Sequence, residues 1–263
     1  MSSGPKKQKD RLVPGAPFNV SSLAIEVVAK LVGRPVPLER GLRQDVVEKL
    51  VDAVMTEDPS AWAQLKSDLQ RARINGAVLA DLYIPEVARR LGQGWQDDCL
   101  SFAEVSIGTA RLQSMLREIG ADWSADGRSV GTNATVLVIV PPDEQHTLGA
   151  MVLVSQLRRR GVSVCLRLAP RAAEIKALLQ SRQFDGVLIS FSSQDCIPQV
   201  SRLVGQLRTA CPRRVFVALG GAAVTGAQEL AARTGVDLVS NDLDLVLQAL
   251  GNNAVLSSLP ETV

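Results

Sequence analysis

The second half of the chain alternates between short apolar runs and helix-like segments, and this alternation limits the possible fold more than any other feature. The apolar runs lie at 135–140, 162–168, 186–191, 214–219 and 237–239. Helical periodicity fills the intervals and the end, at 149–160, 171–181, 196–209, 225–233 and 242–250. Strands that are apolar along their whole length are typical of a sheet covered on both faces. These strand–helix units predict a doubly wound parallel sheet.

The first half has a different pattern and predicts a helical bundle. From about 19 to 121 the apolar residues recur at helical spacing, without the alternation of a strand. Leu23 to Leu31 and Val46 to Val54 each suggest a helix, and longer ones are expected at 62–74, 78–91 and 102–119, with Gly76 ending the first of these. Short turns between helices favour a compact bundle. The expected fold class is therefore α + α/β, a helical bundle followed by a parallel sheet.

The remaining segments are expected to be connections and tails. Residues 122–134 are rich in small and polar types, which is typical of an interdomain linker. Residues 1–18 predict a flexible tail, and their basic cluster fits a solvated terminus better than a phosphate contact. Residues 253–263 form the other expected tail, so the α/β domain is expected at 135–252.

Composition narrows the class of protein. The chain is 46% hydrophobic and 21% charged, which is typical of a globular protein rather than a disordered one. No apolar run is long enough to cross a membrane and no signal peptide is recognisable, so a cytoplasmic location without membrane contact is expected. With a net charge of +2 and no helix-turn-helix signature, contact with DNA is expected to be indirect or weak.

The single histidine, His146, follows the first expected strand in the loop Glu144-Gln145-His146-Thr147-Leu148-Gly149. The carboxyl ends of strands are where open α/β sheets bind ligands. Glu144, two residues upstream, could orient the imidazole as a metal ligand, although a histidine considered alone fits a surface or packing role at least as well. One imidazole cannot hold a free zinc ion, which needs three or four protein ligands. It could supply the axial ligand of a metal already held in a macrocycle.

Two further loops at strand ends contain small residues. Ser190, Ser192 and Ser193 close the third expected strand, and Gly220-Gly221 closes the fourth. Hydroxyls without bulk and a bare glycine backbone predict a groove against which a flat or extended group could lie. Gly149 is expected to let the chain turn tightly into the next helix. No nucleotide-binding glycine motif is present to support a nucleotide as the ligand.

These three loops, in this order, resemble the signature of cobalamin-binding domains: Asp-x-His-x-x-Gly, then Ser-x-Leu, then Gly-Gly. The resemblance implies a flavodoxin-like, Rossmann-like domain that binds cobalamin in the base-off, His-on form, with His146 as the lower axial ligand of cobalt. It further implies that the displaced nucleotide tail passes Ser190, Ser192 and Gly220-Gly221, and that Glu144 accepts the other imidazole N–H. The remaining residues of the loops, Gln145, Thr147, Gly149 and Ser193, complete the expected cofactor-binding set.

The chain departs from this signature at two places. Glu144 stands where the family usually has aspartate, so the carboxylate reaches one methylene further. Ser190-Phe191-Ser192 lacks the usual leucine, so either serine could take the family's serine role.

The helical half contains a distinctive stretch, Leu91 to Phe102, with Trp95 near its centre. A helical cap before a cobalamin domain is the arrangement of corrinoid methyltransferase components and cobalamin photoreceptors. Trp95 is expected either to cover the upper face of the corrin or to be a core residue. Val105-Ser106 stands where such photoreceptors carry Glu-His, which favours a hydroxo or methyl upper ligand over adenosyl without deciding among them.

The stretch runs on through Ile107-Gly108 to Arg111-Leu112-Gln113. With these residues and the loop Glu144 to Ala150, over about residues 80–250, the chain resembles the cobalamin-binding antirepressors of purple photosynthetic bacteria (AerR/PpaA type). The resemblance implies a light-responsive transcriptional regulator without enzymatic activity. Its expected partner is a redox-responsive, DNA-binding repressor of photosynthesis genes. Two alternatives remain open: a corrinoid protein that carries methyl groups between methyltransferases, and an interaction module with a vestigial groove.

Overall fold

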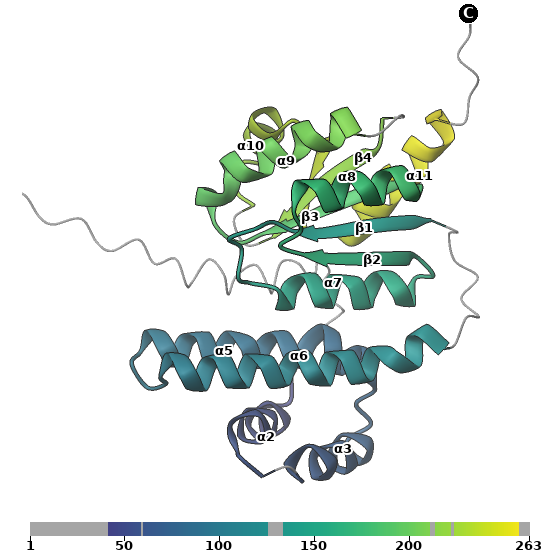
Figure 1. Ribbon diagram of the computed structural model, residues 1–263. Helices are drawn as coiled ribbons and strands as arrows, with labels where there is room; N and C mark the ends of the chain where they lie inside the picture. The colour runs from purple at the N-terminus through teal and green to yellow at the C-terminus, as the bar shows by residue number, and fades with distance from the viewer. Residues whose placement is uncertain (1–41, 59, 126–133, 211–213, 222–223, 258–263) are drawn as a thin grey trace, which may run out of the picture.

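The computed structural model describes residues 42–58, 60–125, 134–210, 214–221 and 224–257. A helical domain lies beneath an α/β domain, and helix α7 (Leu148–Arg159) runs along the boundary between them (Figure 1). The expected helix at Leu23 to Leu31, the tail 1–18 and most of the linker 122–134 lie outside the described residues. This arrangement confirms the predicted fold class, a helical region followed by a parallel sheet with helices.

The sheet contains five parallel strands in the order β2-β1-β3-β4-β5. Their bounds are β1 Thr135–Val140, β2 Ser163–Leu168, β3 Gly186–Phe191, β4 Phe216–Gly221 and β5 Leu238–Val239. The central strands β1 and β3 are almost entirely buried, which explains why each is apolar at successive positions rather than at alternate ones. The sequence located these two strands at the residues where the structure has them.

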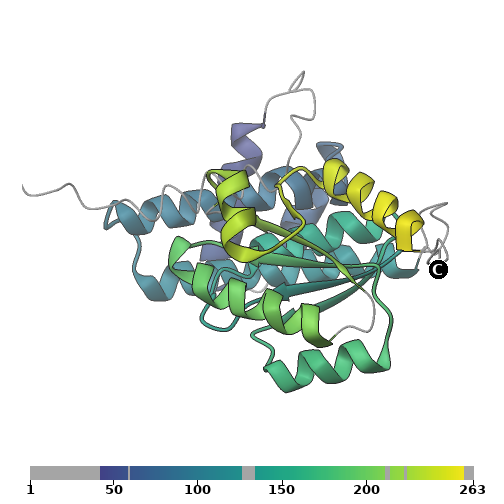
Figure 2. The same cartoon turned by 90° about the horizontal axis from the view of Figure 1, so that it is seen from above.

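Helices cover both faces of the sheet. On one face Leu137 and Ile139 of β1 pack with α8 (Ala172–Ser181), α9 (Ile197–Ala210) and α10 (Ala227–Thr234). On the other face Val136 and Val138 pack with α7 and with α11 (Leu243–Ser257). Seen from above, the strands separate yellow α11 from green α8 (Figure 2). The side chains of one strand thus enter two cores, because successive residues of a strand point to opposite faces.

The helical domain is built on α5 and α6, with α2 and α3 packed below them (Figure 1). Its helices are α2 Gln44–Met55, α3 Ala61–Arg71, α4 Gly76–Val78, α5 Ile84–Gln96 and α6 Phe102–Ala125, and a π-helical turn, η1 Leu79–Tyr83, joins α4 to α5. Leu50, Leu91 and Leu112 are at the centre of its core. Leu148 and Val152 of α7 are buried in the same core, so α7 belongs structurally to both domains.

Three element boundaries differ from those expected. Gly76 begins a helix instead of ending one, because the Asn75 side chain accepts a hydrogen bond from the Val78 N–H at 2.9 Å and caps the new helix. Helix α6 continues to Ala125, which places Trp123 in a helix rather than in the linker. Helix α11 continues past Gly251 to Ser257, since one glycine lowers helix stability without ending the helix.

Within the described ranges, no helix combines the length and the apolar character that crossing a lipid bilayer requires.

Candidate functional site

The loops after β1 and β3 meet because these two strands are neighbours in the sheet. From β1 the chain continues to β2 at one side, whereas β3 and β4 lie on the other side, so the order reverses between β1 and β3. Such a reversal leaves a crevice at the carboxyl ends of the strands, where ligands of this type of fold bind. Glu144 and His146 come from the first loop and Ser192 from the second.

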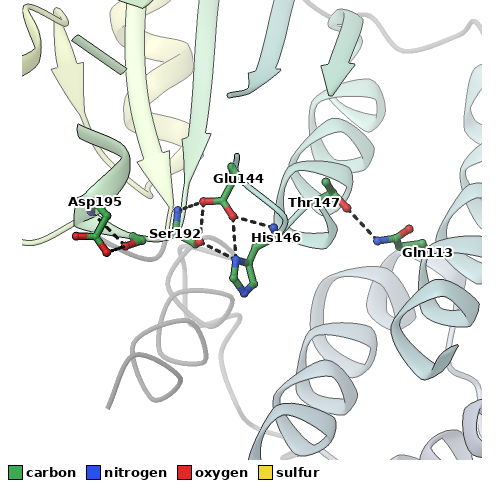
Figure 3. A network of polar contacts seen from close by, with 7 residues as sticks. Gln113, Glu144, His146, Thr147, Ser192 and Asp195 are labelled. Carbon is green, nitrogen blue, oxygen red and sulfur yellow. Dashed lines mark hydrogen bonds and ion pairs between the residues drawn. The ribbon is translucent and has the colours of Figure 1, made fainter. Parts of the chain in front are cut away.

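Glu144 is the centre of a hydrogen-bond network at this point (Figure 3). Its Oε1 accepts the backbone N–H of His146 and faces the imidazole Nδ1, each at 2.8 Å. Its Oε2 accepts the backbone N–H and the hydroxyl of Ser192, each at 2.6 Å. The side chain of Glu144 is only 2% exposed, and these bonds satisfy a carboxylate that would otherwise be costly to bury.

The network fixes the tautomer of His146. An ionised carboxylate can only accept hydrogen bonds, so Nδ1 carries the proton and donates it to Glu144. The Ser192 Oγ, 2.8 Å from Nδ1, donates its own proton to the carboxylate. In the neutral imidazole, Nε2 keeps its lone pair, on a side chain that is 66% exposed. This is the form in which histidine binds a metal, oriented by a carboxylate on its other nitrogen.

The pKa values agree with this arrangement. Burial by itself would raise the pKa of Glu144, but the hydrogen bonds from His146 and Ser192 outweigh it and lower the pKa to about 2. The hydrogen bond to Glu144 raises the pKa of His146 above its ordinary value, against the opposing effect of burial. Glu144 is therefore charged at any physiological pH, and it strengthens the basicity of the imidazole.

The three serines have separate roles. Ser192 contacts both Glu144 and His146. Ser190 is buried in β3 beside Gly220 of β4 and lines a cavity. Ser193 uses its hydroxyl locally, accepting the Asp195 N–H at 3.2 Å. Of the three serines, Ser192 is thus the one that contacts the carboxylate and the imidazole.

Gly221 is required by the backbone. It has a φ of +130°, and a Cβ at this position would lie 1.9 Å from the carbonyl oxygen of Phe191. Asn241 brackets it, accepting the Gly221 N–H at 2.7 Å and donating to the Gly221 carbonyl at 3.2 Å. The glycine therefore permits β4 to approach β3 closely at its end, whatever ligand the groove accepts.

Gly149 does not form the expected turn. It is buried in the first turn of α7, which begins at Leu148. The residue with positive φ in this loop is Asp143, at 72°, immediately before Glu144. Aspartate tolerates this conformation better than most residues do, so the turn needs no glycine. Gly149 is buried in α7 between Leu148, which packs in the core of the helical domain, and Ala150, which packs against the sheet.

A cavity runs inward from this edge of the sheet, between β3, β4 and α11. Of the residues of the predicted groove, Ser190 and Gly220 line this cavity, together with Ser240 and Asn241, which the sequence analysis did not single out. It encloses about 30 Å³, enough for roughly one water molecule. A nucleotide tail would enter only if its walls separated, and the walls outside the sheet are α11 and Leu153 of α7.

The remaining predicted residues lie around this centre. Gln145 is exposed in the loop, and the Thr147 hydroxyl accepts a hydrogen bond from Nε2 of Gln113 in α6 at 2.9 Å (Figure 3). Trp95, near the end of α5, is 48% exposed, so it is not a core tryptophan. Gln113 was not predicted, because nothing in its sequence neighbourhood indicates that α6 meets the loop of His146.

The distinctive stretch before α6 is explained in part by helix capping. Ser101 donates its backbone N–H and its hydroxyl to Glu104, each at 2.7 Å, and its Oγ accepts the Glu104 N–H at 3.2 Å. This reciprocal pair is a capping box, which stabilises the first turn of a helix. Glu104 therefore has a structural role at the start of α6.

The donor set fits a corrin-held metal better than a free ion. Among the described residues, no group of three or more histidine, cysteine, aspartate or glutamate side chains is placed to hold a metal. One exposed imidazole nitrogen is available, and its partner nitrogen is fixed by a buried carboxylate. A metal with its other equatorial ligands already in place would need only this one axial donor.

Comparison with known proteins agrees with the geometry. Residues 134–250 match the B12 binding domain family. The chain is 42% identical over 183 residues to an uncharacterized 20.5 kDa protein in the bchF-crtJ intergenic region of Rhodobacter capsulatus. The aligned residues cover 70% of this chain and 95% of that protein. Its fold is similar to that of the Methanosarcina barkeri monomethylamine corrinoid protein, with a TM-score of 0.61 and 15% identity over 80% of this chain and 99% of the other. Residues 134–250 therefore belong to the B12 binding domain family, the chain as a whole is a relative of the Rhodobacter capsulatus protein, and its fold, a helical region followed by a parallel α/β domain, is that of a corrinoid protein.

Proposed function

We propose that this protein is a cobalamin-binding, light-responsive regulator of transcription, without catalytic activity of its own. It would bind cobalamin in the base-off form with His146 below the cobalt, and act as an antirepressor by contacting a DNA-binding, redox-responsive repressor of photosynthesis genes. The Glu144–His146–Ser192 network is the observation that carries the cofactor part, because it leaves Nε2 free, exposed and oriented.

The regulatory part is supported by the genomic position of the relative. That protein lies in the bchF-crtJ region, a photosynthesis gene region, and this chain spans 95% of its length. A regulator of pigment genes fits that position better than a methyl carrier does. When bound, cobalamin would supply a cobalt centre whose upper bond to carbon is broken by light. Helices α5 and α6 would then report that change to a partner, as a shift between two arrangements of the helical domain.

The axial ligand can be tested by reconstituting the wild type and His146→Ala with hydroxocobalamin. Because His146 is the only histidine, ¹⁵N-labelled histidine marks that side chain alone. In the cobalt(II) form, the superhyperfine splitting in electron paramagnetic resonance should change with the ¹⁵N label in the wild type. His146→Ala should bind at least about tenfold more weakly, as expected for the loss of a metal ligand. Unchanged affinity and an isotope-independent spectrum would rule out His146 as the ligand.

The regulatory step needs a separate experiment. The protein loaded with methylcobalamin is mixed with the candidate repressor in the dark and after illumination, and binding is measured by fluorescence anisotropy of labelled operator DNA. We expect the two forms to differ in their effect on the repressor–DNA complex. The His146→Ala protein is the control and should show no difference between light and dark. Equal effects of the illuminated and dark wild type would contradict light-dependent regulation.

A methyl-carrying corrinoid protein is the second candidate function. The similarity of fold to the monomethylamine corrinoid protein, which extends over 99% of that chain, favours it. To distinguish the carrier from the regulator, the methylcobalamin form is incubated in the dark with the methyltransferase that is encoded nearest to it. Transfer of the methyl group to the enzyme's acceptor would support the carrier, and a purely light-dependent loss of the methyl group would support the regulator.

A further inference from the structure

Thr147 uses its hydroxyl in an unusual way. It occupies the N-cap position of α7, where a threonine oxygen ordinarily accepts a backbone N–H from the first turn of its own helix. Here the Thr147 side chain makes no such bond. Its Oγ1 instead accepts a hydrogen bond from Nε2 of Gln113, at 2.9 Å across the boundary with the helical domain (Figure 3). The residue directly after His146 is thereby fixed to α6.

The loop that carries His146 is consequently held from both sides. On the sheet side, Glu144 is anchored to the end of β3 by the backbone N–H and the hydroxyl of Ser192. On the helical side, Thr147 is anchored to Gln113. His146 lies between these two anchors in the chain, so the position of its imidazole depends on how the helical domain sits against the sheet.

Helix α7 makes the connection stiff. Leu148 and Val152 of α7 are buried in the core of the helical domain, whereas Ala150 and Val154 are buried against the sheet. At the far end of α7, Arg159 forms an ion pair with Asp81. Asp81 lies in the π-helical turn η1, an irregularity that often occurs at functional positions. Movement of the helical domain would therefore be transmitted to α7 at both of its ends.

We propose that Gln113 is a positioning residue for His146, acting through Thr147, so that the arrangement of the helical domain and the reach of the axial imidazole are coupled. This inference rests on the proposed function, in which His146 binds cobalt. Coupling of this kind is reciprocal. An arrangement of α6 that favours the bond between Nε2 and cobalt is in turn favoured by that bond, and a change at the cobalt reaches the surface of the helical domain by the same route.

The test uses the full chain with Gln113→Met and Thr147→Val, which keep the size of each side chain and remove the hydrogen bond. Thr147→Ser, which keeps the hydroxyl, should restore wild-type behaviour. Gln64→Met is the matched control, since the Gln64 amide donates to the Ser60 hydroxyl at the start of its own helix, α3, at 3.0 Å. Hydroxocobalamin affinity is measured by titration, and the ¹⁵N-dependent splitting from His146 is measured in the cobalt(II) form.

Gln113→Met and Thr147→Val should each weaken hydroxocobalamin binding about 3- to 10-fold, the effect of one partly buried hydrogen bond. Each should also reduce the fraction of cobalt(II) that shows the histidine splitting. The double variant should resemble either single variant, because both changes break one contact. A role confined to the stability of the fold would lower the midpoint of urea unfolding without changing the splitting.

Two outcomes separate this inference from the proposed function. Wild-type affinity and splitting in Gln113→Met and Thr147→Val, together with loss of binding in His146→Ala, would overturn the positioning role and leave the axial ligand standing. If His146→Ala itself binds as the wild type does, the proposed axial ligand is wrong and the positioning role falls with it.

Discussion

At the scale of single residues, one buried carboxylate determines the state of the only imidazole. Glu144 makes four hydrogen-bond contacts, two with His146 and two with Ser192. The longer glutamate reaches both Ser192 and the imidazole from a position that is itself almost inaccessible to water. The carboxylate of Glu144, one methylene further from the backbone than that of an aspartate, therefore still contacts the imidazole.

The first prediction concerns the protonation of His146 in the cofactor-free protein. Because Glu144 raises the pKa of His146, nuclear magnetic resonance titration of this sole imidazole should give a pKa above its ordinary value. Glu144→Gln removes the charge and should lower the pKa of His146 toward that ordinary value. Glu57→Gln, an exposed carboxylate of the helical domain, should leave it unchanged. Equal pKa values in wild type and Glu144→Gln would contradict the assigned contact.

The direction of the pH effect follows from that shift. The contribution of the Glu144–His146 pair to stability should be fully present below the pKa of histidine in the unfolded chain, and lost as the pH rises through the raised pKa of the folded state. If His146 is the axial ligand, as proposed, binding of cobalt would have the opposite dependence, because a proton on Nε2 competes with the metal. Cobalamin affinity in the wild type should accordingly fall as the pH decreases through the raised pKa.

At the scale of secondary-structure elements, the ends of β3 and β4 depend on one glycine. Gly221 has a positive φ and no space for a Cβ beside the Phe191 carbonyl, and Asn241, in the loop between β5 and α11, fixes its backbone. The two glycines thus differ in role: the backbone conformation requires Gly221, whereas Gly220 lines the cavity.

Gly221→Ala should lower the free energy of unfolding by at least about 1–3 kcal/mol, the cost of a strained backbone, with the clash against Phe191 adding to it. Urea unfolding followed by circular dichroism measures this change. Gly205→Ala is the matched control, because a Cβ at Gly205 in α9 meets nothing within 4 Å. It should raise stability by up to about 1 kcal/mol, since alanine favours a helix over glycine. Similar effects of the two substitutions would contradict the explanation.

At the scale of the whole molecule, α7 connects two cores that the sequence presents as separate domains. Its apolar side chains enter both cores, and the Asp81–Arg159 ion pair adds a polar contact across the boundary. The Gln156 amide also donates a hydrogen bond to the Asp81 carboxylate, at 3.3 Å. Both charged side chains are largely buried, at 24% and 17% exposure. Removing the Asp81 carboxylate would take away the acceptor of the Arg159 guanidinium hydrogen bonds at this boundary.

Asp81→Ala should therefore weaken the contact between the two domains and lower the free energy of unfolding by roughly 1–3 kcal/mol. All three tryptophans lie in α3, α5 and α6, so their fluorescence reports the helical domain, whereas circular dichroism reports both domains. In the wild type the two unfolding curves should coincide, and in Asp81→Ala they should separate.

The control is Asp68→Ala, which breaks exposed ion pairs with Lys49 and Arg71. It should change the free energy of unfolding by less than about 1 kcal/mol. Coincident, unshifted curves in Asp81→Ala would refute the role of this pair.

Local patterns in the sequence were sufficient for the fold and for the position of His146. Apolar runs of strand length and helical periodicity depend on neighbouring residues, so 135–140 and 186–191 could be located without knowledge of the rest. The family-like motif also placed Glu144 beside His146, since both belong to one short loop. Where local signals competed, as at Gly76, capping by Asn75 overrode the expectation that a glycine ends a helix.

The sequence by itself thus determined a helical region, a parallel sheet and an imidazole with a carboxylate at a strand end. Only the tertiary structure decided that Ser192 rather than Ser190 completes the network, that Gln113 reaches Thr147, and that α7 is shared by two cores. These contacts join residues far apart in the chain. They depend on which strands are neighbours and on how the helical domain is placed against the sheet, and that information comes from the packing of the whole molecule rather than from any one segment.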